Sequence, residues 1–205
     1  MDTDSRSWVT DRPVTSPFAH PAGVRGRLAG RFMLWTSRQD DVLDLLDVRP
    51  GQEVLEVGYG PGALVRRLAA RTGAAVIRGV DPSAEMREAA GRTNRAAVRA
   101  GRVCLGLGTA EATGEEERSA DRVVCVNNVA IWPDLEAGLR EVHRVLRPGG
   151  RAVIAWHGGF APGRIARSLR LPEEHLQRIE RGLAGLFSKV SRSELRSLVA
   201  FTAVR

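Results

Sequence analysis

Residues 53–73, EVLEVGYGPGALVRRLAARTG, constrain the fold most, because they set three glycines between an apolar run and an amphipathic run. The run EVLEV is typical of a buried strand, and ALVRRLAAR has the apolar spacing of a helix. Gly58, Gly60 and Gly62 stand between the two. Glycine permits positive φ angles and lets a ligand approach the main chain without a Cβ in between. The stretch therefore predicts a strand that turns through a glycine loop directly into a helix.

The same alternation continues along the chain. Strand-like runs cover residues 53–57, 75–81, 102–107, 122–128 and 150–156, and helical patterns cover 63–71, 83–100 and 134–146. Strands that alternate with helices form βαβ units, in which helices cover both faces of a parallel sheet. We therefore predict an α/β fold with a doubly wound, mostly parallel sheet and helices on both faces.

The C-terminal part of this sheet is expected to be short. Only 49 residues follow Trp156, and SELRSLVAFTAVR at residues 193–205 supplies at most a helix and one strand. We expect shortened C-terminal strands and an open sheet edge, which favours either pairing with a second copy in a homodimer or a truncated substrate cap.

Length and composition fit a single core. The chain has 205 residues, of which 43% are hydrophobic, enough to bury one substantial core. Residues 1–23 are aperiodic and rich in turn formers, so we predict a flexible N-terminal arm there. Residues 24–48 show two helical pieces, and residues 49–205 hold the α/β domain. The sequence has no apolar run of about 18 residues and no apolar signal segment, so we expect a soluble, cytoplasmic chain.

The charge and the cysteines narrow the classes of function. The net charge is +7, but only Lys189 is a lysine among the 31 basic residues, which indicates an arginine-biased composition. A solvated basic tail explains this charge, and the alternatives are an anionic membrane surface, an acidic substrate or nucleic acid. Cys104 and Cys125 lie in strand-like runs and are predicted to be buried reduced thiols, which disfavours redox chemistry and zinc.

The glycine loop and one aspartate point to a nucleoside ligand. In such sheets, ligands bind outside the carboxyl ends of the strands, where the glycine loop falls. Asp81 ends the second strand about 20 residues later, where a carboxylate suits the two hydroxyls of a ribose. Residues 58–63 also satisfy G-x-G-x-x-A, which keeps a nicotinamide dinucleotide open. Glu56 favours a ligand with an ammonium and a sulfonium, S-adenosylmethionine, because its carboxylate would repel a pyrophosphate.

Four motifs in order resemble those of the class I S-adenosylmethionine-dependent methyltransferases. VLEVGYGPG (54–62) is similar to the first motif, GVDPSAEM (79–86) to the second, and GTAEA (108–112) to the adenine-contact segment. LREVHRVLRPGGRAVIA (139–155) is similar to the helix, turn and strand that close the first half of the fold. The resemblance covers about residues 48–156 and implies a Rossmann-like fold with S-adenosylmethionine as cofactor.

The resemblance also implies roles for residues of the first two motifs. Gly58, Gly60 and Gly62 would form the bed of the methionine and ribose moieties. Glu56 would brace the loop or the amino group of the cofactor, and Asp81 would hold the ribose hydroxyls.

Further roles follow for the adenine side and the fourth strand. Met86 would lie near the adenine, while Ala110 and Glu111 would border its amino group. Asn127 sits where the fourth strand delivers the methyl group to the acceptor. Thr109 departs from the family, because many relatives carry an aspartate there, and this predicts weaker adenine recognition.

The acceptor side is expected to involve aromatic residues and one histidine. Tyr59, inside the glycine loop, is interpreted as a packing or cofactor-wall residue, with an acceptor contact as the alternative. His157 follows the fifth strand at the ligand-bearing end, where an imidazole could act as a catalytic base, although we prefer to interpret it as a surface histidine. Trp132 could stack on an aromatic acceptor or line the adenine pocket, and the alternative is a core residue. In the family, helices before the first strand often cover this pocket, so residues 24–48 are predicted to form a lid, with Phe32 and Trp35 near the acceptor.

Other subfamilies do not fit the sequence. Nucleic-acid amino methyltransferases carry Pro-Pro-aromatic after an Asp or Asn at the fourth strand, where this chain reads NNVA, so DNA is not predicted as a partner. Metal-dependent catechol enzymes place an aspartate there, and none stands between Asp121 and Asp134, so no metal is predicted. A small-molecule acceptor, natural-product or lipid-like, is left by elimination. The alternatives are the same fold without methyl transfer, as a cyclase, isomerase or non-catalytic partner subunit, and an NAD(P)-dependent oxidoreductase.

Overall fold

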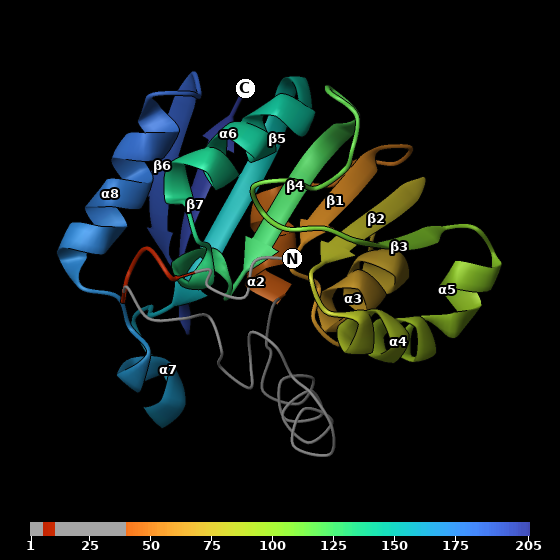
Figure 1. Cartoon of the computed structure of the whole chain (residues 1–205), viewed down its shortest axis with the longest axis horizontal. Helices are drawn as coiled ribbons and strands as arrows, with labels where there is room; N and C mark the ends of the chain where they lie inside the picture. Colours follow the sequence, from red (N-terminus) through yellow and green to blue (C-terminus); the bar gives the residue numbers. More distant parts are fainter. Residues whose placement is uncertain (1–5, 11–39) are drawn as a thin grey trace.

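The computed structural model describes residues 6–10 and 40–205, and its elements alternate as the sequence predicts (Figure 1). The strands are β1 (Glu53–Val57), β2 (Val76–Asp81), β3 (Val103–Leu107), β4 (Ala120–Val126), β5 (Leu146–His157), β6 (Lys189–Glu194) and β7 (Leu198–Val204). The helices are α2 (Asp40–Leu46), α3 (Ala63–Arg71), α4 (Ala84–Thr93), α5 (Arg95–Arg99), the 3₁₀ helix η1 (Val129–Ile131), α6 (Leu135–Val145), α7 (Arg164–Ser168) and α8 (Glu173–Ala184). Among the described helices, none is long and apolar enough to cross a membrane.

One seven-stranded sheet runs through the molecule in the order β3-β2-β1-β4-β5-β7-β6. The first five strands pair in parallel, and β7 pairs antiparallel with both β5 and β6. This confirms the predicted fold class. The strand β7 is the one strand expected within residues 193–205, but the prediction missed β6, since residues 189–204 form the antiparallel β6–β7 hairpin that completes the sheet. The strand β6 was not predicted because its sequence, KVSRSE at residues 189–194, lacks an apolar face.

Two apolar cores lie on opposite faces of the sheet (Figure 1). On one face, α6 and α8 pack over β1, β4, β5 and β7, with Leu139 and Ile179 fully buried. On the other face, α2, α3 and α4 cover the sheet, with Leu46 and Leu68 fully buried. The parallel strands are therefore covered on both sides, which explains their near-continuous apolar sequences.

The C-terminal end of α2 is fixed by arginines of the sheet. The side chain of Arg122 on β4, 6% exposed, donates hydrogen bonds to the carbonyls of Leu46 and Asp47. Arg151 on β5 donates to the carbonyl of Leu45. Cations at this end satisfy carbonyls that lack partners within the helix and complement its dipole. Of the predicted lid segment 24–48, only residues 40–48 are described, so Phe32 and Trp35 lie outside the described residues.

The structure corrects the interpretation of one cysteine. Cys125 is buried on the central strand β4, as predicted, but Cys104 is exposed. Cys104 belongs to β3, which is an edge strand of the sheet and has only β2 as a neighbour. A run of apolar letters therefore overstated the burial of this strand, because a strand at the edge is covered less completely.

Candidate cofactor site at the carboxyl ends of the strands

The glycine loop between β1 and α3 forms one wall of the candidate site. Gly58, Gly60 and Gly62 have φ angles of +74°, +52° and +81°, in the left-handed region that favours glycine. The N–H of Gly58 donates to the carbonyl of Val80 at 2.7 Å. A Cβ at Gly58 would lie 2.1 Å from Nδ2 of Asn128. The loop thus needs glycine both for its backbone conformation and for the close approach of neighbouring side chains.

Asp81 ends β2 directly beside this loop. Its Oδ2 accepts a hydrogen bond from the N–H of Gly60 at 2.9 Å, and its Oδ1 accepts one from the N–H of Ser83 at 3.0 Å. The residue is 6% exposed. Two backbone donors therefore fix the carboxylate at the place where the sequence predicts a ribose contact.

Glu56, on β1 before the loop, is a buried carboxylate with unsatisfied acceptor capacity. It is 4% exposed, and its Oε2 has no hydrogen-bond partner among the described residues. Burial, together with the nearby Asp81 carboxylate, raises the pKa of Glu56 well above its usual value, while a hydrogen bond from the backbone of Val65 opposes this rise. Two neighbouring buried carboxylates are stabilised by a cation. The site therefore fits a ligand that brings positive charge, and a pyrophosphate would add to the repulsion.

Tyr59 points into the protein interior from the glycine loop. It is 3% exposed, and its hydroxyl donates to the carbonyl of Gly106 on β3 at 3.0 Å. Its ring lies over β2, because a Cβ at Gly79 would be 2.7 Å from its Cδ1. Burial raises the pKa of the Tyr59 hydroxyl. The side chain thus braces the loop against two strands.

The predicted adenine-side residues lie on α4 and on the turn that follows β3. Met86 is 5% exposed in the first turn of α4, and Ala110 is 6% exposed in the turn. The Glu111 carboxylate accepts a hydrogen bond from the N–H of Asp134 at 3.4 Å. Thr109, where relatives carry an aspartate, accepts a hydrogen bond from the N–H of Ala112 at its Oγ1, at 3.2 Å. Its hydroxyl therefore supports the turn.

Two asparagines follow β4. Asn127 has a φ of +58°, its N–H donates to the carbonyl of Ala155 on β5 at 2.8 Å, and its Oδ1 is buried without a partner among the described residues. The Nδ2 of Asn128 donates to the carbonyl of Val57 on β1. Only Asn127 was predicted to be functional. Asn128 was missed because its role depends on β1, 71 residues away, which the sequence pattern does not reveal.

The two remaining predicted residues differ in burial. Trp132 is 4% exposed and packs on α6, since a Cβ at Gly138 would be 2.5 Å from its Cε3. His157 is the last residue of β5 and stacks edge-on against Trp156, with ring centroids 5.3 Å apart. Burial lowers the pKa of His157 to about 4. Its imidazole is therefore neutral at pH 7 and can accept a proton only weakly.

Residues 6–10 dock beside the end of β4, which sequence reasoning missed. The Ser7 hydroxyl donates to the carbonyl of Ala130 at 2.7 Å, and the Trp8 indole N–H donates to the carbonyl of Val129 at 2.7 Å. The Trp8 backbone N–H donates to the carbonyl of Trp132 at 3.1 Å. This segment therefore fixes η1, the turn that carries the chain away from Asn127 and Asn128.

Comparisons with known proteins agree with this geometry. A family model described as a methyltransferase domain matches residues 54–150. The chain is 33% identical over 120 residues to the uncharacterized methyltransferase YdaC of Bacillus subtilis, covering 58% of this chain and 61% of that protein. It is 32% identical over 143 residues to the ubiquinone/menaquinone biosynthesis C-methyltransferase UbiE of Geotalea daltonii, covering 69% and 60%. The chain thus spans about 60% of the length of these two curated relatives.

A solved structure shares the fold. It is a putative S-adenosyl-L-methionine-dependent methyltransferase from Methanococcus maripaludis, which superposes with a TM-score of 0.72 at 20% identity and covers 87% of this chain and 91% of that one. The family model begins in β1 and ends inside β5, so it includes the glycine loop, Asp81 and the end of β4. Residues 54–150 therefore match a methyltransferase domain, and the described fold is that of S-adenosylmethionine-dependent methyltransferases.

Proposed function

We propose that this chain transfers the methyl group of S-adenosylmethionine to a small-molecule acceptor. The observation that carries the proposal is the pair of buried carboxylates, Glu56 and Asp81, beside the glycine loop. When bound, S-adenosylmethionine supplies a methyl group on a sulfonium, which an acceptor nucleophile attacks in line while the electron pair of the breaking bond stays on sulfur. Such a reaction depends mainly on positioning.

The chain's residues divide the work of binding. Asp81, oriented by the N–H groups of Gly60 and Ser83, would accept hydrogen bonds from the ribose hydroxyls. Glu56 would interact with the ammonium of the cofactor, which compensates its buried charge. The main chain of the glycine loop would contact the methionine and ribose moieties, and Tyr59 would hold that loop through its hydrogen bond to β3.

The adenine and acceptor sides are proposed from the same frame. Met86, Ala110 and Glu111 would border the adenine. Asn127 would face the reacting groups, because its Oδ1 lacks a partner among the described residues at the carboxyl end of β4. His157 is retained as a candidate for accepting a proton, with the weak basicity that its lowered pKa implies.

A small molecule is proposed as the acceptor by comparison with the relatives. The UbiE relative is named as a C-methyltransferase of quinone biosynthesis. This relative is 32% identical to the chain, so we propose the broader class of natural-product or lipid-like acceptors. The lid predicted from residues 24–48, with Phe32 and Trp35, and the stacking role of Trp132 would shape this acceptor site.

Calorimetric titration with S-adenosylmethionine and S-adenosylhomocysteine tests the proposal. We expect both to bind the wild type. The change Asp81→Ala removes two charge-assisted hydrogen bonds, each worth about 1.5–3 kcal/mol, so affinity should fall by roughly a hundredfold or more. Glu136→Gln is the control, because Glu136 is an exposed carboxylate on α6 that pairs with Arg178.

Two outcomes would contradict the proposal. Absence of binding by either ligand at millimolar concentration would remove S-adenosylmethionine as the cofactor of this chain. Unchanged affinity in Asp81→Ala would show that the ribose lies elsewhere. Transfer of a labelled methyl group to a product then separates a methyltransferase from a cyclase, an isomerase or a non-catalytic partner of the same fold.

A further inference from the structure

The turn of residues 108–113, which borders the proposed adenine position, is closed on itself. The N–H of Thr109 donates to the carbonyl of Ala112 at 3.0 Å, and the N–H of Ala112 donates back to Oγ1 of Thr109 at 3.2 Å. A Cβ at Gly108 would lie 2.8 Å from the carbonyl oxygen of Thr113. The two ends of the turn therefore lie close together.

The near end of the turn is tied to the proposed ribose residue. The N–H of Gly108 donates to the backbone carbonyl of Asp81 at 3.3 Å. Between the two ends stand Ala110 and Glu111, the proposed neighbours of the adenine amino group. Their position thus depends on how firmly both ends are held.

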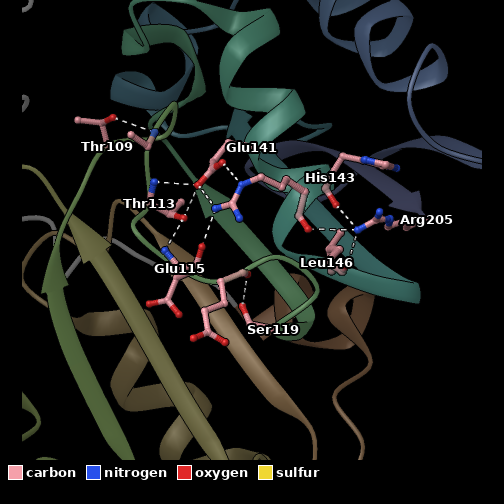
Figure 2. A network of polar contacts seen from close by, with 11 residues as sticks. Thr109, Thr113, Glu115, Ser119, Glu141, His143, Leu146 and Arg205 are labelled. Carbon is pink, nitrogen blue, oxygen red and sulfur yellow. Dashed lines mark hydrogen bonds and ion pairs between the residues drawn. The ribbon is translucent and has the colours of Figure 1, made fainter.

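The far end of the turn is held by a carboxylate on a helix (Figure 2). Both the N–H and the hydroxyl of Thr113 donate to Oε1 of Glu141 on α6, at 3.0 Å and 2.5 Å. Oγ1 of Thr113 in turn accepts from the N–H of Glu115 at 3.2 Å. Thr113 is 2% exposed and Glu141 is 8% exposed, so these bonds are shielded from water.

The charge of Glu141 is compensated within the same network. Nε of Arg144 donates to Oε2 of Glu141 at 2.7 Å, and Nη2 donates to Oε1 at 2.8 Å. Nη2 also donates to the carbonyl of Glu115 at 2.6 Å. Burial would raise the pKa of Glu141, but hydrogen bonds from Arg144 and Thr113 outweigh it and lower that pKa below its usual value. Glu141 is therefore ionised at neutral pH and binds Thr113 through strong, charge-assisted hydrogen bonds.

We propose that Glu141 and Thr113 act as a positioning pair that sets the recognition of the adenine amino group. The inference rests on the proposed function. Neither residue needs to touch the cofactor: Glu141 anchors Thr113, Thr113 fixes the turn, and the turn presents Ala110 and Glu111 to the adenine. Residues that support binding groups from behind commonly decide how well those groups are placed.

The test measures adenine recognition directly. Calorimetry compares S-adenosylhomocysteine with S-inosylhomocysteine, in which a carbonyl oxygen replaces the adenine amino group. In the wild type we expect the adenosyl ligand to bind more tightly. The ratio to follow is the dissociation constant of S-inosylhomocysteine divided by that of S-adenosylhomocysteine. Thr113→Val keeps the shape of the side chain and removes the hydroxyl, and it should reduce this ratio about tenfold. Thr113→Ser restores the hydroxyl and should return the ratio to within about twofold of the wild type.

A second variant and a control complete the design. Glu141→Gln keeps the shape and removes the charge, so it should reduce the ratio in the same direction if Thr113→Val does not fold. Glu136→Gln changes an exposed carboxylate of the same helix and should leave the ratio unchanged.

Failure of this inference can be told apart from failure of the proposed function. If Thr113→Val or Glu141→Gln lowers the melting temperature but keeps the ratio of dissociation constants, the pair is merely structural and the inference is refuted. If Thr113→Ser behaves like Thr113→Val, the hydroxyl is not the relevant group and the inference is also refuted. If the wild type binds neither ligand, the proposed function itself is wrong.

Discussion

The glycine loop allows one prediction in which the cost of a single methyl group can be worked out. Gly58 and Gly51 both have positive φ angles, +74° and +83°. A Cβ at Gly58 would lie 2.1 Å from Nδ2 of Asn128, whereas a Cβ at Gly51 would have no atom within 4 Å. The two Gly→Ala changes thus share the backbone cost and differ in the collision.

The backbone cost is about 1–2 kcal/mol, because a left-handed conformation is unfavourable for residues with a Cβ. Part of it is offset by the lower entropy of the unfolded alanine chain, by about 0.4–1 kcal/mol in both variants. At Gly58, Asn128 must also move and lose its hydrogen bond to the carbonyl of Val57. Breaking a buried hydrogen bond costs about 1–3 kcal/mol. We therefore expect Gly51→Ala to cost about 1 kcal/mol and Gly58→Ala about 2–4 kcal/mol.

Urea denaturation followed by tryptophan fluorescence and far-ultraviolet circular dichroism measures both variants. The free energy of unfolding comes from linear extrapolation, and equal slopes show that the unfolded states are comparable. For a domain of this size the extra cost at Gly58 corresponds to a further fall in melting temperature of roughly 2–12 °C. In an Asn128→Ala background, Gly58→Ala should cost close to what Gly51→Ala costs. Equal destabilisation by the two single changes would refute the reasoning, because it would mean that Asn128 does not occupy the space beside Gly58.

Three further predictions concern titration and reactivity. Because the pKa of Glu56 is raised in the folded state, the free energy of unfolding should decrease as pH rises above 4.5. Glu56→Gln should remove this decrease in urea titrations of the ligand-free protein, and it should also weaken S-adenosylmethionine binding. The pKa of His157 is lowered from 6.5 to about 4, so the unfolded chain binds this proton at a higher pH than the folded chain does. The free energy of unfolding should therefore fall by at most about 3 kcal/mol as pH drops from 6.5 towards 4. His157→Gln should reduce this pH dependence. Cys104 should react with a thiol reagent in the native protein, whereas Cys125, whose pKa is raised by burial, should react only after unfolding. Modification of two thiols per chain in the native protein would contradict this assignment.

The parallel half of the fold could be predicted because its signals are local. Each strand is an apolar run and each following helix has its own periodicity, so predicted and observed bounds agree closely from β1 to β5. One difference is the predicted helix 83–100, which breaks at Asn94 into α4 and α5. Asn94 donates through Nδ2 to the carbonyls of Gly62 and Ala90, and this contact with the glycine loop has no signature in the sequence.

The candidate site was predictable where spacing alone defines it. Glycines after a strand and an acidic residue at the end of the next strand pointed to Gly60 and Asp81, and the structure joins them by a hydrogen bond. Contacts between distant segments were not predictable. Thr113 and Glu141 are 28 residues apart and come from a turn and a helix whose packing only the folded chain defines. Trp8 likewise contacts a carbonyl 121 residues away.

The order β5-β7-β6 makes the outer part of the sheet depend on its last strand in sequence. Within the described sheet, β6 has β7 as its one neighbour, so β6 is attached to the rest of the sheet only through residues 198–204. Arg205 fastens this strand, since its guanidinium donates to the carbonyls of His143, Arg144 and Leu146 (Figure 2). Detachment of β7 would therefore release β6 with it and uncover the side of α8 that packs on β6. Protection from hydrogen exchange should accordingly decrease outward from β5 through β7 to β6, with β6 and β7 opening as one cooperative unit.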